Sequence, residues 1–234
     1  MIELTRHRQR LRLAPEQGGV VVSWCHEGRE LLRPAPARLD DPRDAAGFPL
    51  VPFSGRIALG RFRLQGMDVA LPPNMPPEPH AIHGQGWQNA WHLGHRGDDQ
   101  ATLVFDHRAG AWPWAYRATQ HFVLTGTGLE LRLSLHNRGA TAMPAGLGWH
   151  PYFPRAGARL RADVLGIWKS GDDMVPAPPR APTSQEDLRQ ERRVDDLELD
   201  DCFDAGSEGV HLRWPDHGLT LAMTASETLR KLIV

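Results

Sequence analysis

The fold class is indicated by the stretch LELRLSLH, residues 129–136, in which apolar and polar side chains alternate without a break. A period of two predicts a β-strand that buries one of its faces. Residues 119–125, just before it, are rich in β-forming side chains, and the glycines at 126 and 128 supply a turn. The two runs are therefore predicted to form a β-hairpin.

Short strand patterns recur outward from this hairpin. Alternation returns at Leu219, Leu221 and Met223, and residues 20–22, 57–71 and 102–105 are further strand candidates. The best helical candidate, residues 184–193, is polar, and we expect it to be a short surface helix or a loop. Many short strands separated by turns predict an all-β protein, an antiparallel sandwich or barrel. We expect one domain over residues 1–234.

Composition excludes several classes of function. The 234 residues carry a net charge of -1, which gives no global electrostatic case for binding nucleic acid or an anionic membrane. No run of about 18 apolar residues is present, and the N-terminus lacks an apolar signal core. Two cysteines make no disulfide framework. We expect a cytoplasmic protein, and the sequence does not indicate its oligomeric state.

Four segments concentrate polar groups that a β-scaffold does not need. The first, FPLVPFSGRI at residues 48–57, sets Arg56 in an apolar frame. An arginine there needs acceptors, either a carboxylate in a structural ion pair or the oxygens of a ligand.

The second segment, HAIHGQGW at residues 80–87, follows a proline-dense loop that we expect to be rigid. Its His-x-x-His spacing is a weak metal signal, since no Cys lies near and no Glu follows. His83 is either a hydrogen-bonded structural residue or, beside Trp87 and two glycines, part of a sugar pocket.

The third segment, GLGWHPYF at residues 146–153, sets His150 between glycines and aromatic rings. Histidine transfers protons near neutral pH, and Tyr152 offers both a ring and a hydroxyl. The competing interpretation is a core histidine. The fourth segment, LDDCFD at residues 199–204, has acidic groups suited to accept hydrogen bonds from sugar hydroxyls, and it lacks the spacing of a Ca²⁺ loop.

The sequence contains no motif for several other kinds of chemistry. The chain has no nucleophile elbow, no Walker A motif and no dinucleotide fingerprint. A cupin-type metal site needs a close H-x-H pair and a following Glu, which are absent. What remains is proton transfer by histidine, with Arg, Asp and aromatic rings to orient a ligand. We expect no cofactor and no metal.

These four segments, in this order, resemble those of the aldose 1-epimerase (galactose mutarotase) family. The resemblance implies a galactose mutarotase-like β-sandwich, or supersandwich, and an isomerase that interconverts the α and β anomers of a free hexose. By the same resemblance His150 is the general acid toward the ring oxygen, and His83 is the second histidine at the sugar. Arg56 and Asp200 are the sugar-binding residues, and we expect Trp87 and Tyr152 to contact the sugar.

Two departures from the family pattern matter. Gly55 stands where the family has Asn. The family's general base is a Glu in a C-terminal Glu-Pro segment, and none follows the strand expected at residues 228–234. Glu78-Pro79 lies in another segment, and Glu227 precedes that strand. We therefore expect either a mutarotase domain lacking its C-terminal segment or a carbohydrate-binding or regulatory protein without efficient catalysis.

Overall fold

Antiparallel strands make up nearly all the regular structure in the computed structural model, which describes residues 1–234. The helical segments are six 3₁₀ turns of three residues each. None of them has the length and apolar character needed to cross a membrane. The predicted all-β class is confirmed.

Residues 184–193 form a loop that ends in β16 (Arg192–Arg193), so the helical alternative is wrong. Side chains in this loop bond to its own backbone. Glu186 accepts from the Thr183 N–H at 2.9 Å, and Asp187 accepts from the Arg189 N–H at 2.9 Å. Such local bonds compete with the helical hydrogen-bond ladder.

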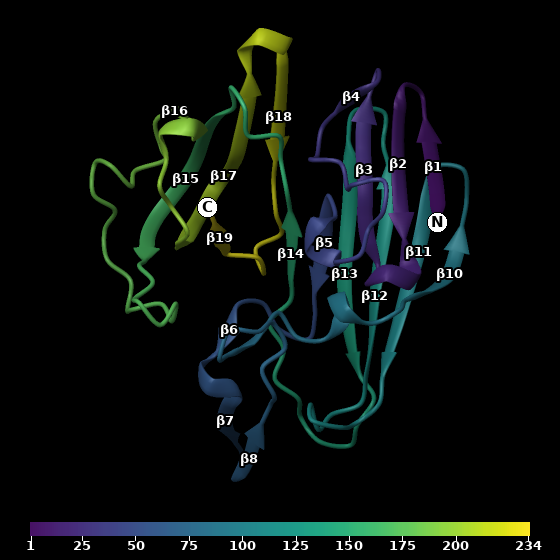
Figure 1. The fold of residues 1–234 in the computed structure, drawn as a ribbon, viewed down its shortest axis with the longest axis vertical. Helices are drawn as coiled ribbons and strands as arrows, with labels where there is room; N and C mark the ends of the chain where they lie inside the picture. Colours follow the sequence, from purple (N-terminus) through teal and green to yellow (C-terminus); the bar gives the residue numbers. More distant parts are fainter. The chain divides into compact units, whose positions relative to one another are not determined.

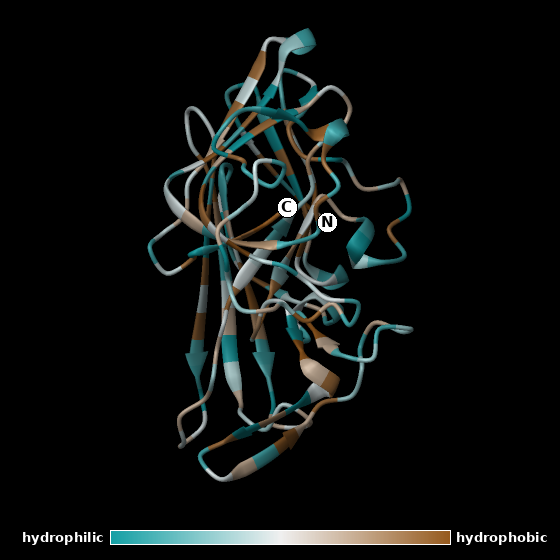
Figure 2. Ribbon diagram, turned by 90° about the vertical axis from the view of Figure 1, so that its left-hand side faces the viewer, coloured by the Kyte–Doolittle hydropathy of each residue, from teal (hydrophilic) through white to brown (hydrophobic).

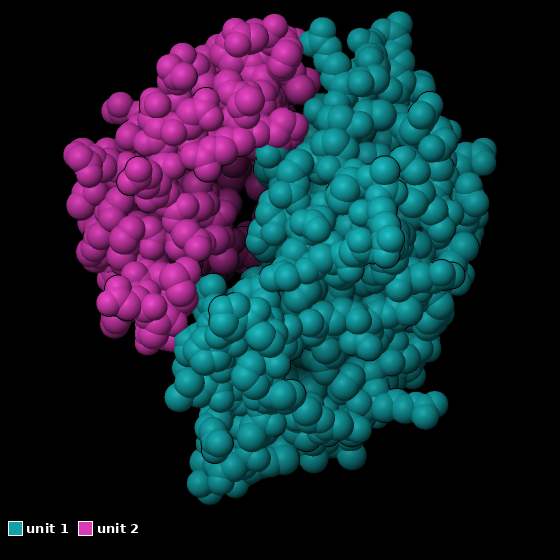
Figure 3. Space-filling model, viewed as in Figure 1, with its two compact units in different colours: residues 1–153 teal, residues 154–234 magenta.

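Contacts divide the chain into two compact units, Met1–Phe153 and Pro154–Val234 (Figure 3). A single domain over residues 1–234 stays a prediction.

The first sheet of unit 1 joins segments that lie far apart in the sequence (Figure 1). Its strand order is β1-β2-β3-β5-β14, with β4 also paired to β3. The pairing of β14 with β5 sets His150 directly opposite Phe48. The strands are β1 (Ile2–Arg6), β2 (Gln9–Ala14), β3 (Val20–His26), β4 (Arg29–Glu30), β5 (Gly47–Leu50) and β14 (Gly148–Pro151).

The second sheet of unit 1 contains the predicted hairpin. Its order follows the sequence: β10 (His92–Arg96), β11 (Gln100–His107), β12 (Tyr116–Leu124) and β13 (Leu129–Asn137). The turn brings Leu124 opposite Leu129, which confirms the hairpin. Burial alternates along both strands. Figure 2 shows hydrophilic and hydrophobic bands following one another along strand ribbons of the molecule.

The two sheets of unit 1 form a sandwich, with the second running behind the first in Figure 1. Leu4, Leu11 and Leu13 of the first sheet and Leu103 and Phe122 of the second are fully buried. Buried polar groups also connect the layers, since the Gln120 amide donates to the Gly19 carbonyl at 2.8 Å. A close-packed core of this kind excludes water.

Two short ribbons extend unit 1: β6 (Arg56–Ile57) pairs with β9 (Ala81–Ile82), and β7 (Arg61–Leu64) pairs with β8 (Met67–Ala70). The strand candidate at residues 57–71 is thus a 3₁₀ turn followed by a hairpin. The chain reverses at Gln65 and Gly66, which have φ of 49° and 86°. Only the glycine adopts that backbone conformation without strain.

Unit 2 is one antiparallel sheet of order β16-β15-β17-β18, with β19 also on β17. β15 (Arg159–Trp168) and β17 (Cys202–Trp214) are its long central pair. The alternation at residues 219–223 predicted β18 (Leu219–Met223) correctly. The short β19 (Lys231–Ile233) lies within the expected strand at residues 228–234.

Shortening Phe122 tests the core of unit 1. The ring is fully buried on β12, so Phe122→Ala is expected to lower the free energy of unfolding by about 3–5 kcal/mol. Glu130→Ala, at an exposed site on β13, serves as the control and is expected to change it by less than about 0.5 kcal/mol. Urea unfolding followed by tryptophan fluorescence measures both. Equal effects would contradict the assigned core.

Candidate active site

Three aromatic rings surround His150 on β14. Its imidazole stacks on Phe48 with ring centroids 4.9 Å apart, and the Tyr152 ring lies 4.6 Å away. His83 meets it edge-on, with centroids 5.8 Å apart and an interplanar angle of 86°. The structure thus brings together three of the predicted site residues. Packing fixes the orientation of the ring that is predicted to transfer a proton.

His83 forms a reciprocal pair of hydrogen bonds with Gly55. The His83 N–H donates to the Gly55 carbonyl at 2.9 Å, and the Gly55 N–H donates to His83 Nδ1 at 3.1 Å. Because Nδ1 accepts, the neutral imidazole carries its proton on Nε2. Gly55 has a φ of 75°, a backbone conformation that glycine and asparagine adopt more readily than other residues.

His83 is neutral at physiological pH. Burial, which is the largest cause, and the charges of His150 and Arg56 together lower its pKa from 6.5 to about 3. A buried imidazole loses the hydration that stabilises its charged form, and nearby cations oppose the added proton. The ring therefore offers a ligand one hydrogen-bond donor, Nε2–H.

Asn74 holds the residues on both sides of His83. Its amide accepts from the Ile82 N–H at 2.8 Å and donates to the Ile82 carbonyl at 2.8 Å and the Gly84 carbonyl at 3.0 Å. The Asn74 side chain thus satisfies backbone groups of residues 82 and 84 that a neighbouring strand would otherwise bond. The proline-dense loop is thereby tied to the segment that carries His83.

Gly84 allows the backbone to approach Val51 closely. Its φ is 65°, and a Cβ atom there would lie 2.1 Å from the Val51 carbonyl oxygen. That oxygen accepts hydrogen bonds from the N–H groups of Gln85 and Gly86, at 3.1 and 3.0 Å. The glycine that follows His83 is thus required by the backbone path.

Arg56 has a carboxylate partner. Its Nε donates to Glu78 Oε2 at 3.1 Å, and the two side chains are only 22% and 13% exposed. The structural ion pair is therefore confirmed, while sugar binding by Arg56 stays a prediction. The sequence alone does not identify Glu78 as the partner of Arg56, because the two residues lie in different segments. The only indication was that an arginine in an apolar segment needs a hydrogen-bond acceptor.

Tyr152 is half-buried under an arginine. The Arg33 guanidinium lies 4.1 Å from the centre of its ring, and the Arg33 N–H donates to the Tyr152 carbonyl at 2.8 Å. Burial raises the pKa of the phenol, which therefore stays protonated. The residue can offer both a ring surface and a hydroxyl, as predicted from its type.

Trp87 lies in the core beneath Phe48. Its ring is 3% exposed, with its centroid 5.8 Å from that of Phe48, and its indole N–H donates to the Gly84 carbonyl at 3.1 Å. Little of the ring surface is free to stack on a ligand. Its contact with a sugar stays a prediction, and its observed role is to support Phe48.

The two histidines of the His-x-x-His segment bond to different backbone groups. His80 Nδ1 accepts from the Leu59 N–H at 2.9 Å, and His83 Nδ1 accepts from Gly55. The residue His80 is 4% exposed, which agrees with a structural role. The structure contains no cluster of three or more His, Cys, Asp or Glu side chains placed to hold a metal ion.

Asp200 lies in unit 2, exposed and two residues before the start of β17 at Cys202. Its neighbour Asp201 is 3% exposed and accepts from Lys169 Nζ at 2.6 Å and from the Ser170 N–H at 3.1 Å. The two adjacent carboxylates thus divide into one structural group and one open to solvent. The sugar-binding role of Asp200 stays a prediction.

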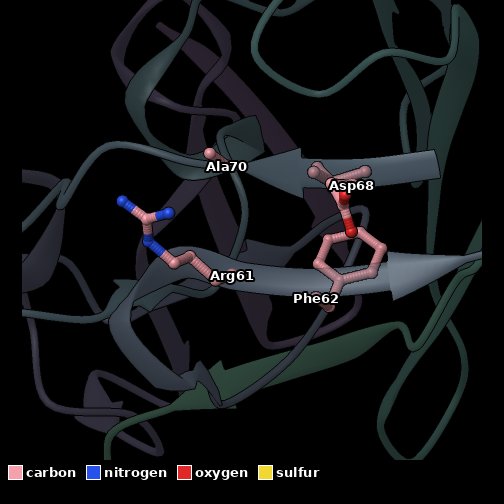
Figure 4. Close-up of a pocket in the computed structure, with 5 residues that line it drawn as sticks. Arg61, Phe62, Asp68 and Ala70 are labelled. Carbon is pink, nitrogen blue, oxygen red and sulfur yellow. The ribbon is translucent and has the colours of Figure 1, made fainter.

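Two surface hollows in unit 1 lie apart from the predicted site residues. One is formed by β7 and β8, with Arg61 and Phe62 on one strand and Asp68 and Ala70 on the other (Figure 4). The other is lined by Met1, Ile2, Pro15, Glu16, Trp91, His92 and Leu93. Neither His83 nor His150 lines either hollow.

A pair of glycine substitutions tests the backbone path at the site. Gly55 and Gly84 both have positive φ, but a Cβ atom on Gly55 would meet nothing within 4 Å. Gly55→Ala is expected to cost about 1–2 kcal/mol of unfolding free energy through backbone strain. Gly84→Ala adds the clash with Val51 and is expected to cost about 2 kcal/mol more. Equal costs in urea unfolding would contradict the close approach.

The low pKa of His83 predicts a pH dependence of stability. Between pH 6.5 and 3 the unfolded chain binds a proton at this residue and the folded protein does not. Stability is therefore complete above about pH 6.5 and falls as the pH falls, by up to about 1.4 kcal/mol per pH unit. His83→Gln should remove this dependence. Parallel stability curves for both proteins in urea unfolding from pH 7 to 4 would contradict the assignment.

Comparison with known proteins supports one family. The family model for aldose 1-epimerase matches residues 1–234, the whole chain. The chain is 40% identical to YphB of Escherichia coli K12 over 154 residues, which are 65% of this chain and 52% of YphB. It is 33% identical to YihR of the same organism over 109 residues, 45% of this chain and 35% of YihR. The chain spans about half or less of the length of these curated relatives.

Solved structures share the fold. A candidate aldose 1-epimerase from Escherichia coli K12 superposes with a TM-score of 0.85 at 31% identity, covering 93% of this chain and 74% of that one. A galactose mutarotase-like protein from Clostridium acetobutylicum gives 0.86 at 18% identity, covering 99% and 79%. The galactose mutarotase-like β-sandwich expected from the resemblance is confirmed. The chain belongs to the aldose 1-epimerase family.

Proposed function

We propose that this protein interconverts the α and β anomers of a free hexose. The observation that carries the proposal is the edge-on pair of His150 and His83, in which the second imidazole is held neutral with its proton on Nε2. Arg56 contributes a positive charge beside this pair, as its effect on the pKa of His83 indicates.

The proposed reaction needs two proton transfers. A base removes the proton of the anomeric hydroxyl while His150 protonates the ring oxygen, and the bond between C1 and that oxygen breaks. Rotation about C1–C2 and closure on the other face give the second anomer, as the hydroxyl that closes the ring returns its proton to His150 and the base returns its proton to the anomeric oxygen. Each proton transfer by a positioned side chain contributes about 10²–10⁴-fold. An imidazole suits the acid role because its proton exchanges near neutral pH.

The remaining groups would bind and orient the sugar. His83 donates from Nε2–H to a sugar oxygen, and Arg56 donates from its Nη nitrogens. Asp200 accepts hydrogen bonds from hydroxyls, and Tyr152 contributes its ring and hydroxyl. No cofactor or metal has a step in this scheme.

A second function is a carbohydrate-binding or regulatory protein on the same fold. One observation favours it: Glu78, a carboxylate beside the proposed sugar-binding residue Arg56, is already paired with that arginine. The binding-only function predicts saturable sugar binding without any increase in the rate of anomer exchange. Calorimetry and polarimetry on the same protein sample distinguish the two functions.

Polarimetry on freshly dissolved α-glucose and α-galactose tests the proposed enzyme. His150→Ala is expected to lower the enzyme-dependent rate by about 10²–10⁴-fold, because the ring oxygen loses its acid. His136→Ala, at an exposed position of β13, is the matched control and should leave the rate unchanged. Equal rates for His150→Ala and the unmodified protein would refute the role given to His150.

A further inference from the structure

We propose that Glu78 positions Arg56 for sugar binding, an inference that rests on the proposed function. The Glu78 carboxylate accepts from the guanidinium at Nε, with a distance of 3.1 Å. A guanidinium carries five N–H donors in one plane, so this contact uses one and leaves the four of the Nη nitrogens. Those four donors form a fork that can bond two neighbouring oxygens of a sugar.

Because both side chains are largely buried, the contact with Glu78 determines the orientation of the Arg56 side chain. The Arg56 side chain is 22% exposed and that of Glu78 is 13% exposed, so neither charge is fully hydrated. An arginine that loses its carboxylate in such a place tends to turn toward water, because a half-buried unpaired charge is costly. Its backbone is fixed by pairing with Ile82 on β9, the residue before His83. Only the side chain is free to turn.

Glu78 is itself held from several sides. Its backbone N–H donates to the Met75 carbonyl at 2.9 Å, and Pro77 and Pro79 restrict the backbone on either side. Its other carboxylate oxygen, Oε1, lies 3.7 Å from His80 Nε2.

His80 is held in turn by the Leu59 N–H, which donates to Nδ1 at 2.9 Å. The imidazole therefore carries its proton on Nε2, the nitrogen that faces Glu78. Two hydrogen bonds, with the 3.7 Å approach of His80 Nε2 to Glu78 between them, thus connect Leu59 to Arg56. This series of contacts gives a function to the buried His80 and to the proline-dense loop, which the proposed reaction otherwise leaves unused.

Both carboxylate oxygens of Glu78 face a cationic or N–H group, one at Arg56 and one at His80. We therefore assign Glu78 a positioning role through Arg56, and not the role of the base that removes the anomeric proton. The two roles predict different kinetics. Loss of a positioned binding group raises KM, whereas loss of the base lowers kcat.

The test compares anomer exchange and sugar binding in Glu78→Gln, which keeps the shape of the side chain and removes its charge. Polarimetry with D-galactose and D-glucose gives KM and kcat, and calorimetry gives the dissociation constant. We expect KM and the dissociation constant to rise about 10-fold or more, with kcat nearly unchanged. Arg56→Ala should give a similar loss, and the double variant should lose little beyond either single one.

Glu186→Gln is the matched control, because it breaks another Arg–Glu pair with a similarly buried carboxylate. Glu186 accepts from both Nη nitrogens of Arg180 at 2.7 and 2.8 Å, and its side chain is 11% exposed. This variant should lower the melting temperature and leave KM unchanged. Arg56→Lys is a second test that spares the charge pair: it should keep the melting temperature near that of the unmodified protein and still raise KM, because lysine lacks the fork.

Three outcomes would overturn the inference. One is an unchanged KM in folded Glu78→Gln, and another is an unchanged KM in Arg56→Lys. The third is a loss confined to kcat together with a changed acidic limb of the pH profile, which would make Glu78 the proton acceptor. Failure of the proposed function gives a different result, since the unmodified protein would then not accelerate anomer exchange, whether or not it binds the sugars.

Discussion

The pairing of β14 with β5 is the interaction on which the candidate site depends. It joins segments about one hundred residues apart and sets His150 opposite Phe48, on which the imidazole then stacks. Glycines make the close fit possible. A Cβ atom on Gly47 would lie 3.0 Å from the Trp149 ring, and one on Gly148 would lie 2.9 Å from the Ser54 hydroxyl. The orientation of the proposed acid is thus set by a strand register, which a loop alone would not fix.

Electrostatics then distinguishes the two histidines that this packing brings together. His83 accepts the Gly55 N–H and lies in a buried site beside Arg56, so the proton is kept off Nδ1 and the ring stays neutral. Two adjacent imidazoles in water would titrate alike. Here His83 is restricted to donating a hydrogen bond, and in the proposed reaction His150 transfers the proton. The division of roles follows from the backbone and burial, since the two residues are chemically identical.

Alternation of apolar and polar residues along the sequence predicted the strands well, but it did not predict contacts between residues far apart in the sequence. The hairpin at residues 119–136 and β18 were predictable because alternation is a property of neighbouring residues. The stretch at 57–71 broke into a turn and a hairpin, because its reversal depends on the backbone at Gln65 and Gly66. The pairing of Glu78 with Arg56, the burial of Trp87 and the burial of Asp201 beside the exposed Asp200 all depend on tertiary neighbours. The periodicity of the sequence does not indicate which residues are in contact in the folded protein.

At Arg56 a structural ion pair and the proposed sugar binding are compatible. The two lysines of the chain, Lys169 and Lys231, each form an ion pair with an aspartate of unit 2, and an ammonium is a compact point charge. A guanidinium is planar and has two edges. Glu78 holds Arg56 through Nε, and the Nη donors remain for another partner. An ion pair that fixes the plane of the arginine therefore prepares it to bind, because the entropy of ordering the side chain is lost before the ligand arrives.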